Sequence, residues 1–333
     1  MNEMKASSAD ADPRLLDLNR WLSRVLETEE YVLSPASADA SFRRYFRIAV
    51  DGGTRIVMDA PPDKEDSRPF VTIAKLLQAA GLHGPQVLAS DLEKGFLLLT
   101  DLGTRLYIDA LQQGDPEPLM QDAIRALVQW QCASQPGVLP AYDRALLQRE
   151  LDLFPDWYIT RHLQRELSTV QRAAWDAVCE QLIAAALAQP QVYVHRDYMP
   201  RNLMVSEPNP GIIDFQDAVF GPIAYDLLSL FKDAFLSWPA EQVAVWRQQY
   251  HAAASAAGLP VGSADDFERA FDWIGLQRHL KVLGIFARIC YRDGKPHYLS
   301  DTPRFIGYIR EVLPGYPELE PLLALFDELG MEA

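Results

Sequence analysis

A short run of polar side chains interrupts an apolar stretch near the middle of the chain. His195, Asp197 and Asn202 follow the run Val-Tyr-Val. Asp214 follows Gly-Ile-Ile, twelve residues after Asn202. The spacing His-x-Asp-x-x-x-x-Asn, with a later Asp at the end of an apolar strand, is typical of loops that transfer phosphoryl groups. Such a transfer needs one carboxylate beside the attacking hydroxyl and hard oxygen ligands for Mg²⁺ between the phosphates.

Each of these residues has an expected role in that chemistry. Asp197 fits the base that orients the attacking hydroxyl and accepts its proton, while Asn202 and Asp214 fit the metal ligands. His195 is expected to brace the loop from behind as a buried hydrogen-bonding residue. A His-Arg-Asp tripeptide alone is common by chance, and Asp and Asn favour turns for ordinary backbone reasons. Pro200 within the loop and the strand-borne Asp214 favour the catalytic interpretation.

The composition is that of an ordinary globular protein with an acidic balance. The 333 residues are 49% hydrophobic and 23% charged, and this length suits one bilobal unit or two domains. The formal net charge of -15 argues against nonspecific binding to nucleic acids. The same charge repels ATP, so a nucleotide would need local recognition by Mg²⁺, arginine and backbone amides.

The cysteines and the apolar runs favour an intracellular, membrane-free protein. Cys132, Cys179 and Cys290 are far apart and odd in number, without metal-binding spacing or a disulfide framework. The polar, acidic N-terminus has no apolar signal core. No run approaches the roughly 20 apolar residues of a membrane span. We therefore expect a cytoplasmic protein without a membrane partner.

The residues up to Asp101 predict a small, sheet-rich lobe. After a loose polar tail at 1–12, Pro13 opens an amphipathic helix that reaches Leu26. A strong turn signal, Asp51-Gly-Gly, lies within a hairpin meander. A five-stranded sheet with one further helix is expected, with strand-like runs at 42–50, 54–58, 87–91 and 95–100 and the helix at 70–80.

The residues from Leu102 onward predict a larger, mainly helical lobe. The shift in composition gives two predicted lobes, 1–101 and 102–333. Asp226, near the start of one helix, is expected to be structural and stabilised by the free N–H groups of that helix. The expected helices span 119–132, 169–187, a segment beginning at 221, 240–257, 266–291, 302–312 and 318–329.

The catalytic loop, Asp214, the small first lobe and the helical second lobe together resemble one known group of enzymes. They are similar to the aminoglycoside phosphotransferase and choline kinase-like superfamily, and the resemblance covers nearly the whole chain. It implies an α+β fold of the bilobal, protein kinase-like type, with ATP bound by the small β-rich lobe. By position, the backbone of Thr100, Asp101 and Leu102 would meet adenine where the strand becomes a linker.

Three further segments resemble the bacterial anomeric kinases for N-acetylmuramate and N-acetylglucosamine, which act in peptidoglycan recycling. The segments are Ser41–Arg47, Val57–Asp66 and Glu150–Trp157. This resemblance implies ATP- and Mg²⁺-dependent phosphorylation of the sugar's 1-hydroxyl to give the α-1-phosphate.

Sugar recognition is expected to use carboxylates for the ring hydroxyls and an aromatic side chain for the ring face. The candidates are Asp156, Trp157, Arg161 and Asp217. An arginine among them would suit a lactyl carboxylate, because a guanidinium binds a carboxylate through two hydrogen bonds. The alternative for Trp157 is that it belongs to the core.

The first lobe departs from the kinase pattern where a cation should face the phosphates. The kinase lysine of the third strand is missing from Arg55–Asp59, and the helix at 70–80 has no acid to pair with one. Arg43, Arg44 and Lys64 are candidates for a replacement cation. The alternative is that all three are solvated surface charges.

Other departures argue against a protein kinase. The stretch 34–41 lies where a phosphate-covering loop is expected, but it has small residues and no glycines. Tyr198 and Met199 stand where a protein kinase carries a phosphate-contacting lysine, and no Ala-Pro-Glu follows Asp214. Gln216 replaces the glycine of the Asp-Phe-Gly motif, which argues against flipping of that segment.

Two rival functions stay open. One is another small-molecule kinase of the same fold, because a cationic substrate such as an aminoglycoside or choline would suit the acidic balance. The other is an inactive kinase-like binding protein, which the missing lysine motivates and the intact Asp197, Asn202 and Asp214 oppose. Under the favoured interpretation we expect a monomer with a small-molecule amino-sugar substrate and no nucleic-acid partner.

Overall fold

A computed structural model describes residues 12–37 and 42–332. The chain divides into two compact units, one of residues 1–79 and 84–103 and one of residues 80–83 and 104–333. Residues 80–83 belong to the second unit although they precede residue 101 in the chain. All of the predicted tail except Asp12 lies outside the described residues.

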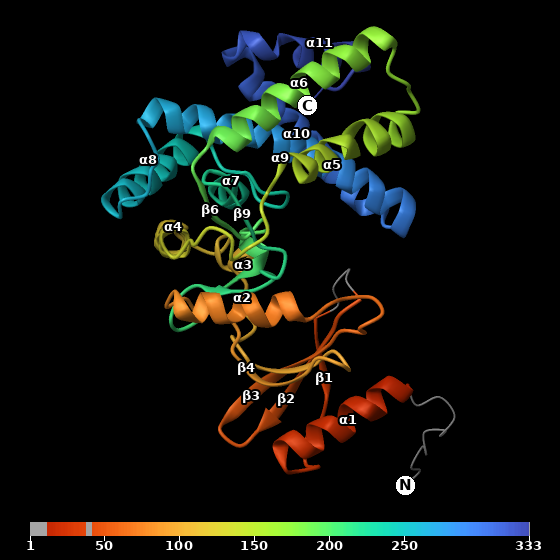
Figure 1. Ribbon diagram of the computed structural model, residues 1–333, viewed down its shortest axis with the longest axis vertical. Coiled ribbons are helices and arrows are strands. Elements are labelled where there is room, and N and C mark those ends of the chain that lie inside the picture. Colours follow the sequence, from red (N-terminus) through yellow and green to blue (C-terminus); the bar gives the residue numbers. More distant parts are fainter. Residues whose placement is uncertain (1–11, 38–41, 333) are drawn as a thin grey trace. The chain divides into compact units, whose positions relative to one another are not determined.

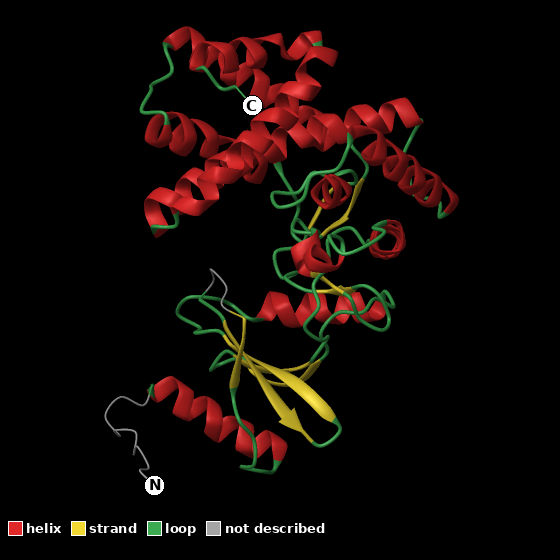
Figure 2. Ribbon diagram, turned by 180° about the vertical axis from the view of Figure 1, so that it is seen from behind, coloured by secondary structure: helices red, strands yellow, loops and turns green. Residues whose placement is uncertain are grey.

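The first unit is built on a five-stranded antiparallel sheet, as predicted (Figure 2). Its spatial order is β1-β2-β3-β5-β4, and β2 and β3 pair from Arg44 opposite Asp59 to Val50 opposite Gly53. Gly52 and Gly53 both have positive φ, which the tight hairpin requires and a glycine tolerates. The strands are β1 (Ser34–Ser37), β2 (Arg44–Val50), β3 (Gly53–Asp59), β4 (Val87–Asp91) and β5 (Phe96–Thr100).

Two helices complete the first unit, α1 (Pro13–Leu26) and α2 (Arg68–Ala79). The side chain of Asp12 caps α1 by accepting a hydrogen bond from the backbone N–H of Arg14, and Pro13 is its first residue. The apolar face of α1 and inward-facing strand residues form one core, made of Leu18, Trp21, Leu22, Ile48, Val57, Phe96 and Leu98. The predicted helix at 13–26 is therefore confirmed, and its periodicity buries it against the sheet.

The stretch 34–41, which lies where a phosphate-covering loop is expected, begins as a strand. Residues 34–37 form β1, the edge strand that pairs with β2. Residues 38–41 lie outside the described part of the chain.

The second unit is mainly helical, with short strands around the predicted catalytic loop (Figure 1). The strands pair as two small antiparallel sheets, β6 with β9 and β7 with β8. Its helices are α3 (Tyr107–Ala110), α4 (Glu117–Cys132), α5 (Arg144–Leu153), the π-helix η1 (Phe154–His162), α6 (Thr169–Ala188), the 3-10 turn η2 (Pro200–Asn202), α7 (Tyr225–Phe231), α8 (Ala240–Ala256), α9 (Ala264–Asp293), η3 (Pro296–Asp301), α10 (Thr302–Val312), η4 (Leu313–Gly315), η5 (Pro317–Leu319) and α11 (Glu320–Leu329). Its strands are β6 (Gln191–Val194), β7 (Leu203–Met204), β8 (Gly211–Ile212) and β9 (Val219–Pro222).

Helix α9 forms the centre of the second unit. It is 30 residues long, begins with a capping box between Ser263 and Asp266, and ends at Gly294 in the left-handed conformation. It packs against α5, α6, α7, α10 and η1, so both of its sides are buried along much of its length. Within the described residues, no helix combines the length and apolarity needed to cross a bilayer.

Two glycines of α9 set how closely its neighbours approach. A Cβ at Gly284 would lie 2.3 Å from the carbonyl carbon of Leu153, which is the last residue of α5. A Cβ at Gly275 would lie 3.0 Å from a methyl group of Leu228 on α7, and that side chain can move. The α5–α9 contact therefore depends on the absence of a side chain at residue 284.

Gly284→Ala is expected to lower the free energy of unfolding by about 2–3 kcal/mol, because overpacking against backbone atoms cannot be relieved by a rotamer change. Gly275→Ala is the matched control. Its free energy of unfolding should change less, because alanine stabilises a helix interior relative to glycine by roughly 0.5–1 kcal/mol. Urea unfolding of the two variants and the wild type measures both. Equal losses of stability would contradict this account of the α5–α9 contact.

Candidate active site

The polar residues singled out by their spacing lie at the ends of the short strands of the second unit. Residues 195–199 follow β6, and Asn202 ends the turn η2. Asp214 comes two residues after β8. The backbone N–H of Ile213 donates to the carbonyl of Asn202 (3.1 Å), which joins the two segments. The hairpins thus bring together side chains that are up to 19 residues apart in the sequence.

Asp197, Asn202 and Asp214 form one group. The side-chain amide of Asn202 donates to the backbone carbonyl of Asp197 (3.0 Å), and its nitrogen lies 3.4 Å from a carboxylate oxygen of Asp214. Gln216 donates to the other oxygen of Asp214 (2.9 Å). This glutamine, which replaces the expected glycine, therefore orients the Asp214 carboxylate.

Two residues of the site, one next to the group and one within it, have a strained backbone. Arg196 has a φ of 73° and Asp214 a φ of 62°, both in the left-handed region that side chains disfavour. Such conformations cost of order 1–3 kcal/mol each and persist where the surroundings fix them, most often at functional sites. The strain falls on the residue before Asp197 and on Asp214 itself. In both places the backbone conformation sets the direction of a predicted functional side chain.

His195 is buried behind the loop and connects the backbone at Asp197 to the backbone at Ile213. Its Nδ1 accepts from the backbone N–H of Asp197 (3.3 Å), so its Nε2 carries the proton and donates to the carbonyl of Ile213 (3.0 Å). Burial lowers the pKa of His195 to about 4, although the nearby Asp197 acts in the opposite direction. The imidazole is therefore neutral near pH 7 and acts as a fixed hydrogen-bonding bridge.

Asp226 requires a correction to its expected stabilisation. It lies in the first turn of α7, but its carboxylate accepts from the backbone N–H groups of His195 (2.6 Å) and Arg196 (2.9 Å). The prediction of a structural role is confirmed, but the two N–H groups that it binds belong to a loop about 30 residues earlier and not to its own helix. Burial raises the pKa of Asp226 to about 7, against the two N–H groups, which lower it.

The predicted phosphate-facing arginines, Arg43 and Arg44, are paired with carboxylates inside the first unit. Arg44 binds Asp59, which is fully buried, through Nε (2.9 Å) and Nη2 (2.5 Å), and it also pairs with Asp12. Arg43 pairs with Glu65. Lys64 lies 3.5 Å from Asp63 and is half exposed. The carboxylate of Asp59 thus determines where one of the two arginines points.

The residues expected to meet adenine lie at the end of β5. Asp101 forms a two-pronged ion pair with Arg47 (2.6 and 3.0 Å). Burial acts to raise the pKa of Asp101, but Arg47 together with the hydrogen bonds from Thr54 and Gly103 lowers it. The hydroxyl of Thr100 accepts from the backbone N–H of Gln86 (2.9 Å), and Leu102 is buried. The side chains of Asp101 and Thr100 therefore hold the end of β5 to Arg47 and to the backbone of Gln86.

The sugar candidates lie on two different segments of the second unit. Asp156, Trp157 and Arg161 lie on η1, where Asp156 and Arg161 are exposed and Trp157 is half-buried. Asp217 is exposed and follows Gln216. Among the described residues, no hydrogen bond or ion pair joins Asp217 to the three on η1. Trp157 is not part of the buried core, contrary to the alternative interpretation of that residue.

The oxygen donors at Asn202 and Asp214 fit a magnesium ion that is shared with a nucleotide. The described residues contain no group of three or more His, Cys, Asp or Glu side chains able to hold a metal by itself. Mg²⁺ in nucleotide sites commonly uses one or two protein ligands and takes its remaining ligands from phosphates and water. The Asp214 carboxylate lies beside the Asn202 side chain, whose amide nitrogen is 3.4 Å from one of its oxygens, and this pair of side chains agrees with that requirement.

Comparison of the chain with known proteins identifies its family. The model of the phosphotransferase enzyme family matches residues 32–264. The chain belongs to this family. The predicted resemblance to aminoglycoside phosphotransferases and choline kinases and the predicted α+β, protein kinase-like fold are thereby confirmed.

Two curated relatives are similar over nearly their whole length. The N-acetylmuramate/N-acetylglucosamine kinase of Pseudomonas aeruginosa is 52% identical over 97% of this chain and 99% of its own. The N-acetylmuramate/N-acetylglucosamine kinase of Pseudomonas putida is 52% identical over 96% of this chain and 97% of its own. One solved structure, the ternary complex of APH(2'')-IIa with streptomycin and ATP, has a TM-score of 0.59 at 15% identity, covering 89% of this chain and 99% of its own. That structure shows the likeness of fold.

Motif spacing missed residues that hold the phosphotransferase loop in place. Glu150 and Lys281, both buried, belong to the network around Arg196, and Asp226 holds the loop backbone. The sequence carries a usable signal for Asp226, because it is a charged residue within an otherwise apolar helical run. Such a residue needs a buried partner. The identity of that partner follows only from the fold.

The neutral His195 predicts a pH dependence of stability. The unfolded chain takes up a proton near pH 6.5 and the folded chain only near pH 4. The contribution of His195 is therefore present above pH 6.5 and is lost as the pH falls to 4, by about 3 kcal/mol. His195→Gln should remove this loss, so urea unfolding from pH 7 to pH 4 should show a smaller decline in the variant.

The control is His297→Gln, which removes an exposed histidine and should leave the pH dependence of the wild type unchanged. Parallel stability curves for the wild type and His195→Gln would show that the imidazole is not held neutral by the fold.

Proposed function

We propose that the protein is an ATP- and Mg²⁺-dependent kinase that phosphorylates the 1-hydroxyl of N-acetylmuramate and N-acetylglucosamine to the α-1-phosphate, in peptidoglycan recycling. The main support for this proposal is the group Asp197, Asn202 and Asp214, whose backbone is strained and is held by hydrogen bonds. It occurs in a chain whose relatives along nearly the whole length bear that kinase name.

Asp197 is proposed to act on the attacking hydroxyl. Its backbone is fixed through His195 and Asn202, which leaves its half-buried carboxylate to orient the sugar and receive the proton. The 1-hydroxyl of a hemiacetal is more acidic than an ordinary alcohol. Orientation is therefore proposed as the larger part of the role of Asp197.

Asn202 and Asp214 are the proposed holders of Mg²⁺. Gln216 fixes one oxygen of the Asp214 carboxylate, and the loop fixes the amide of Asn202. When bound, Mg²⁺ would supply neutralisation of phosphate charge during transfer.

The first unit is proposed to bind ATP, as the lobe 1–101, and the lobe 102–333 is proposed to carry the sugar. The proposed ATP contacts are Arg43, Arg44, Thr100, Asp101 and Leu102, and the proposed sugar contacts are Asp156, Trp157, Arg161 and Asp217. The exposure of Asp156, Arg161 and Asp217 leaves them accessible to a ligand. We further propose a cytoplasmic monomer with no nucleic-acid partner.

A coupled ADP-release assay with Mg-ATP tests the proposal against the rivals. Turnover is expected with N-acetylmuramate and N-acetylglucosamine and not with choline or an aminoglycoside. Turnover of choline or the aminoglycoside alone would overturn the sugar assignment, and no ADP with any acceptor would favour an inactive binding protein.

Asp197→Asn is expected to lower kcat for both sugars by at least about 100-fold, because it removes the proton acceptor while preserving shape. Asp17→Asn is the matched control, since Asp17 is a surface residue of α1 paired with Arg20. Its activity should equal that of the wild type. Near-wild-type kcat in Asp197→Asn would exclude the proposed base.

A further inference from the structure

A single buried carboxylate in the second unit accepts hydrogen bonds from four side chains. One oxygen of Glu150 accepts from Arg196 (2.5 Å) and from Lys281 (2.8 Å). The other oxygen accepts from the hydroxyl of Tyr142 and from the amide of Gln277 (3.1 Å). All these donors are directed at one side chain that is only 5% exposed.

These contacts connect the catalytic loop to the helices around it. Glu150 lies near the end of α5, while Gln277 and Lys281 lie one turn apart on α9. Lys281 also donates to the hydroxyl of Tyr225, the first residue of α7 (3.0 Å). The Glu150 carboxylate therefore ties α5, α7 and α9 to the loop through Arg196.

Arg196 is the loop residue whose backbone is strained and which directly precedes Asp197. Its backbone N–H is held by the Asp226 carboxylate, and its guanidinium is held by Glu150. A left-handed arginine persists only if its surroundings over-determine it. Two buried carboxylates provide that constraint. Asp226 binds the main-chain N–H of Arg196, and Glu150 binds its guanidinium.

The charges of the cluster keep Glu150 ionised. Burial alone would raise its pKa, but Lys281 and Arg196 outweigh burial, so the pKa of Glu150 is lowered to about 2. One anion thus faces the buried Lys281 and the partly buried Arg196. Removing the anion leaves both cations without a compensating charge, which is a costly arrangement in a protein interior.

We propose that Glu150 is a positioning residue of the phosphotransfer reaction: by holding the Arg196 guanidinium it fixes the turn that aims Asp197 toward Asn202 and Asp214. This inference rests on the proposed function, and it assigns to Glu150 a role that acts through Arg196 without contact with the substrate.

A double-mutant cycle tests whether Glu150 acts through Arg196. Glu150→Gln, Arg196→Met and the double variant are compared with the full-length wild type in kcat, in KM for ATP and for N-acetylglucosamine, and in thermal midpoint. Glu150→Gln is expected to lower kcat by about 10–100-fold with both KM values changed less than about 3-fold, because misplacing a catalytic group by about 1 Å has effects of this size. In the Arg196→Met background, Glu150→Gln should lower kcat no further.

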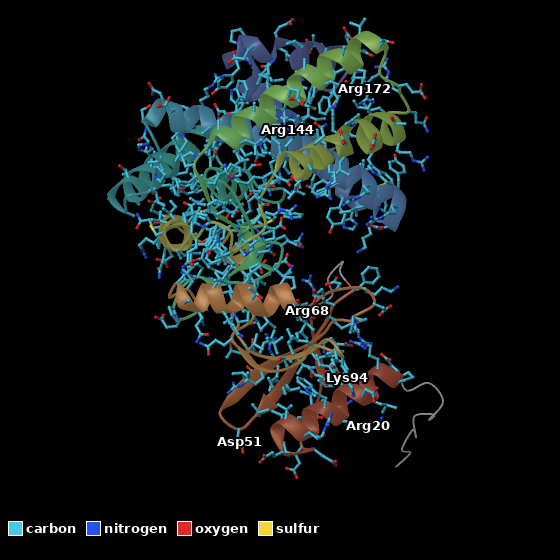
Figure 3. All side chains as sticks on the ribbon, in the orientation of Figure 1. Arg20, Asp51, Arg68, Lys94, Arg144 and Arg172 are labelled. Carbon is cyan, nitrogen blue, oxygen red and sulfur yellow. The ribbon has the colours of Figure 1, made fainter. Side chains whose placement is uncertain are left out.

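The matched control is Glu180→Gln. Glu180 on α6 pairs with Arg144, the first residue of α5, in an exposed ion pair, and Figure 3 labels Arg144. This variant removes the same group, a glutamate carboxylate, from an ion pair whose arginine lies on α5, and it should keep wild-type kcat. If Glu150→Gln does not fold, Arg196→Met carries the test, since it leaves Glu150 paired with Lys281, Tyr142 and Gln277.

The outcomes separate a positioning role from a structural one. Independent, multiplying effects of the two substitutions on kcat would overturn the proposal, as would unchanged kcat in Arg196→Met. A lowered thermal midpoint with unchanged kcat would assign Glu150 to stability alone. If the wild type phosphorylates a different acceptor of the panel, the proposed sugar is wrong and the cycle is measured on that acceptor. A wild type that transfers phosphate to none contradicts both proposals.

Discussion

The arrangement of the site depends on one buried carboxylate, that of Asp226, which accepts from two consecutive backbone amides. Those amides belong to His195 and Arg196, immediately before Asp197. Consecutive N–H groups point the same way only if the backbone leaves the extended conformation, and Arg196 does so with a φ of 73°. Without an acceptor at that point the loop would have two buried unpaired donors, which cost free energy comparable to lost hydrogen bonds.

The rest of the second unit supports this arrangement. His195 bridges the loop to the segment that carries Asp214, and Glu150 anchors the Arg196 side chain to α5 and α9. Gly284 allows α5 and α9 to approach closely enough for such a cluster to form between them. Because packed helices are stiff, a loop fixed to three of them keeps its geometry without substrate. Preorganisation of this kind is what phosphoryl transfer requires, since positioning and electrostatics supply most of its catalysis.

The first unit follows a different constraint. Met58 and Asp59 at the end of β3 are both fully buried, and the carboxylate of Asp59 is paired by Arg14 from α1 and Arg44 from β2. The strand therefore carries an acid, where a kinase pattern leads one to look for a lysine. A buried carboxylate demands compensating cations, which accounts for the direction of Arg44 toward the interior of this unit.

Periodicity and local chemistry predicted most of the fold. The apolar spacing from Pro13 to Leu26 predicted α1 and its first residue, and the Asp51-Gly-Gly turn predicted the β2–β3 hairpin. The spacing of Asp197, Asn202 and Asp214 also selected residues that the structure joins through the Asn202 side chain. Partners distant in sequence were not predictable, because Glu150 meets Arg196 across 46 residues and Asp226 meets His195 across 31. Such pairings are decided by helix packing, which a linear pattern does not record.

The sugar oxygen that receives the phosphate is identified most directly by phosphorus NMR of the product. The product of Mg-ATP and N-acetylglucosamine is analysed without purification, with proton decoupling on and off. We predict a new phosphorus signal that is split by the anomeric proton, together with an anomeric proton signal that has the small H1–H2 coupling of an α-1-phosphate. Both signals should disappear on mild acid treatment. A phosphorus signal coupled to the C6 protons and stable to acid would contradict it, because the enzyme would then be a kinase of an ordinary alcohol.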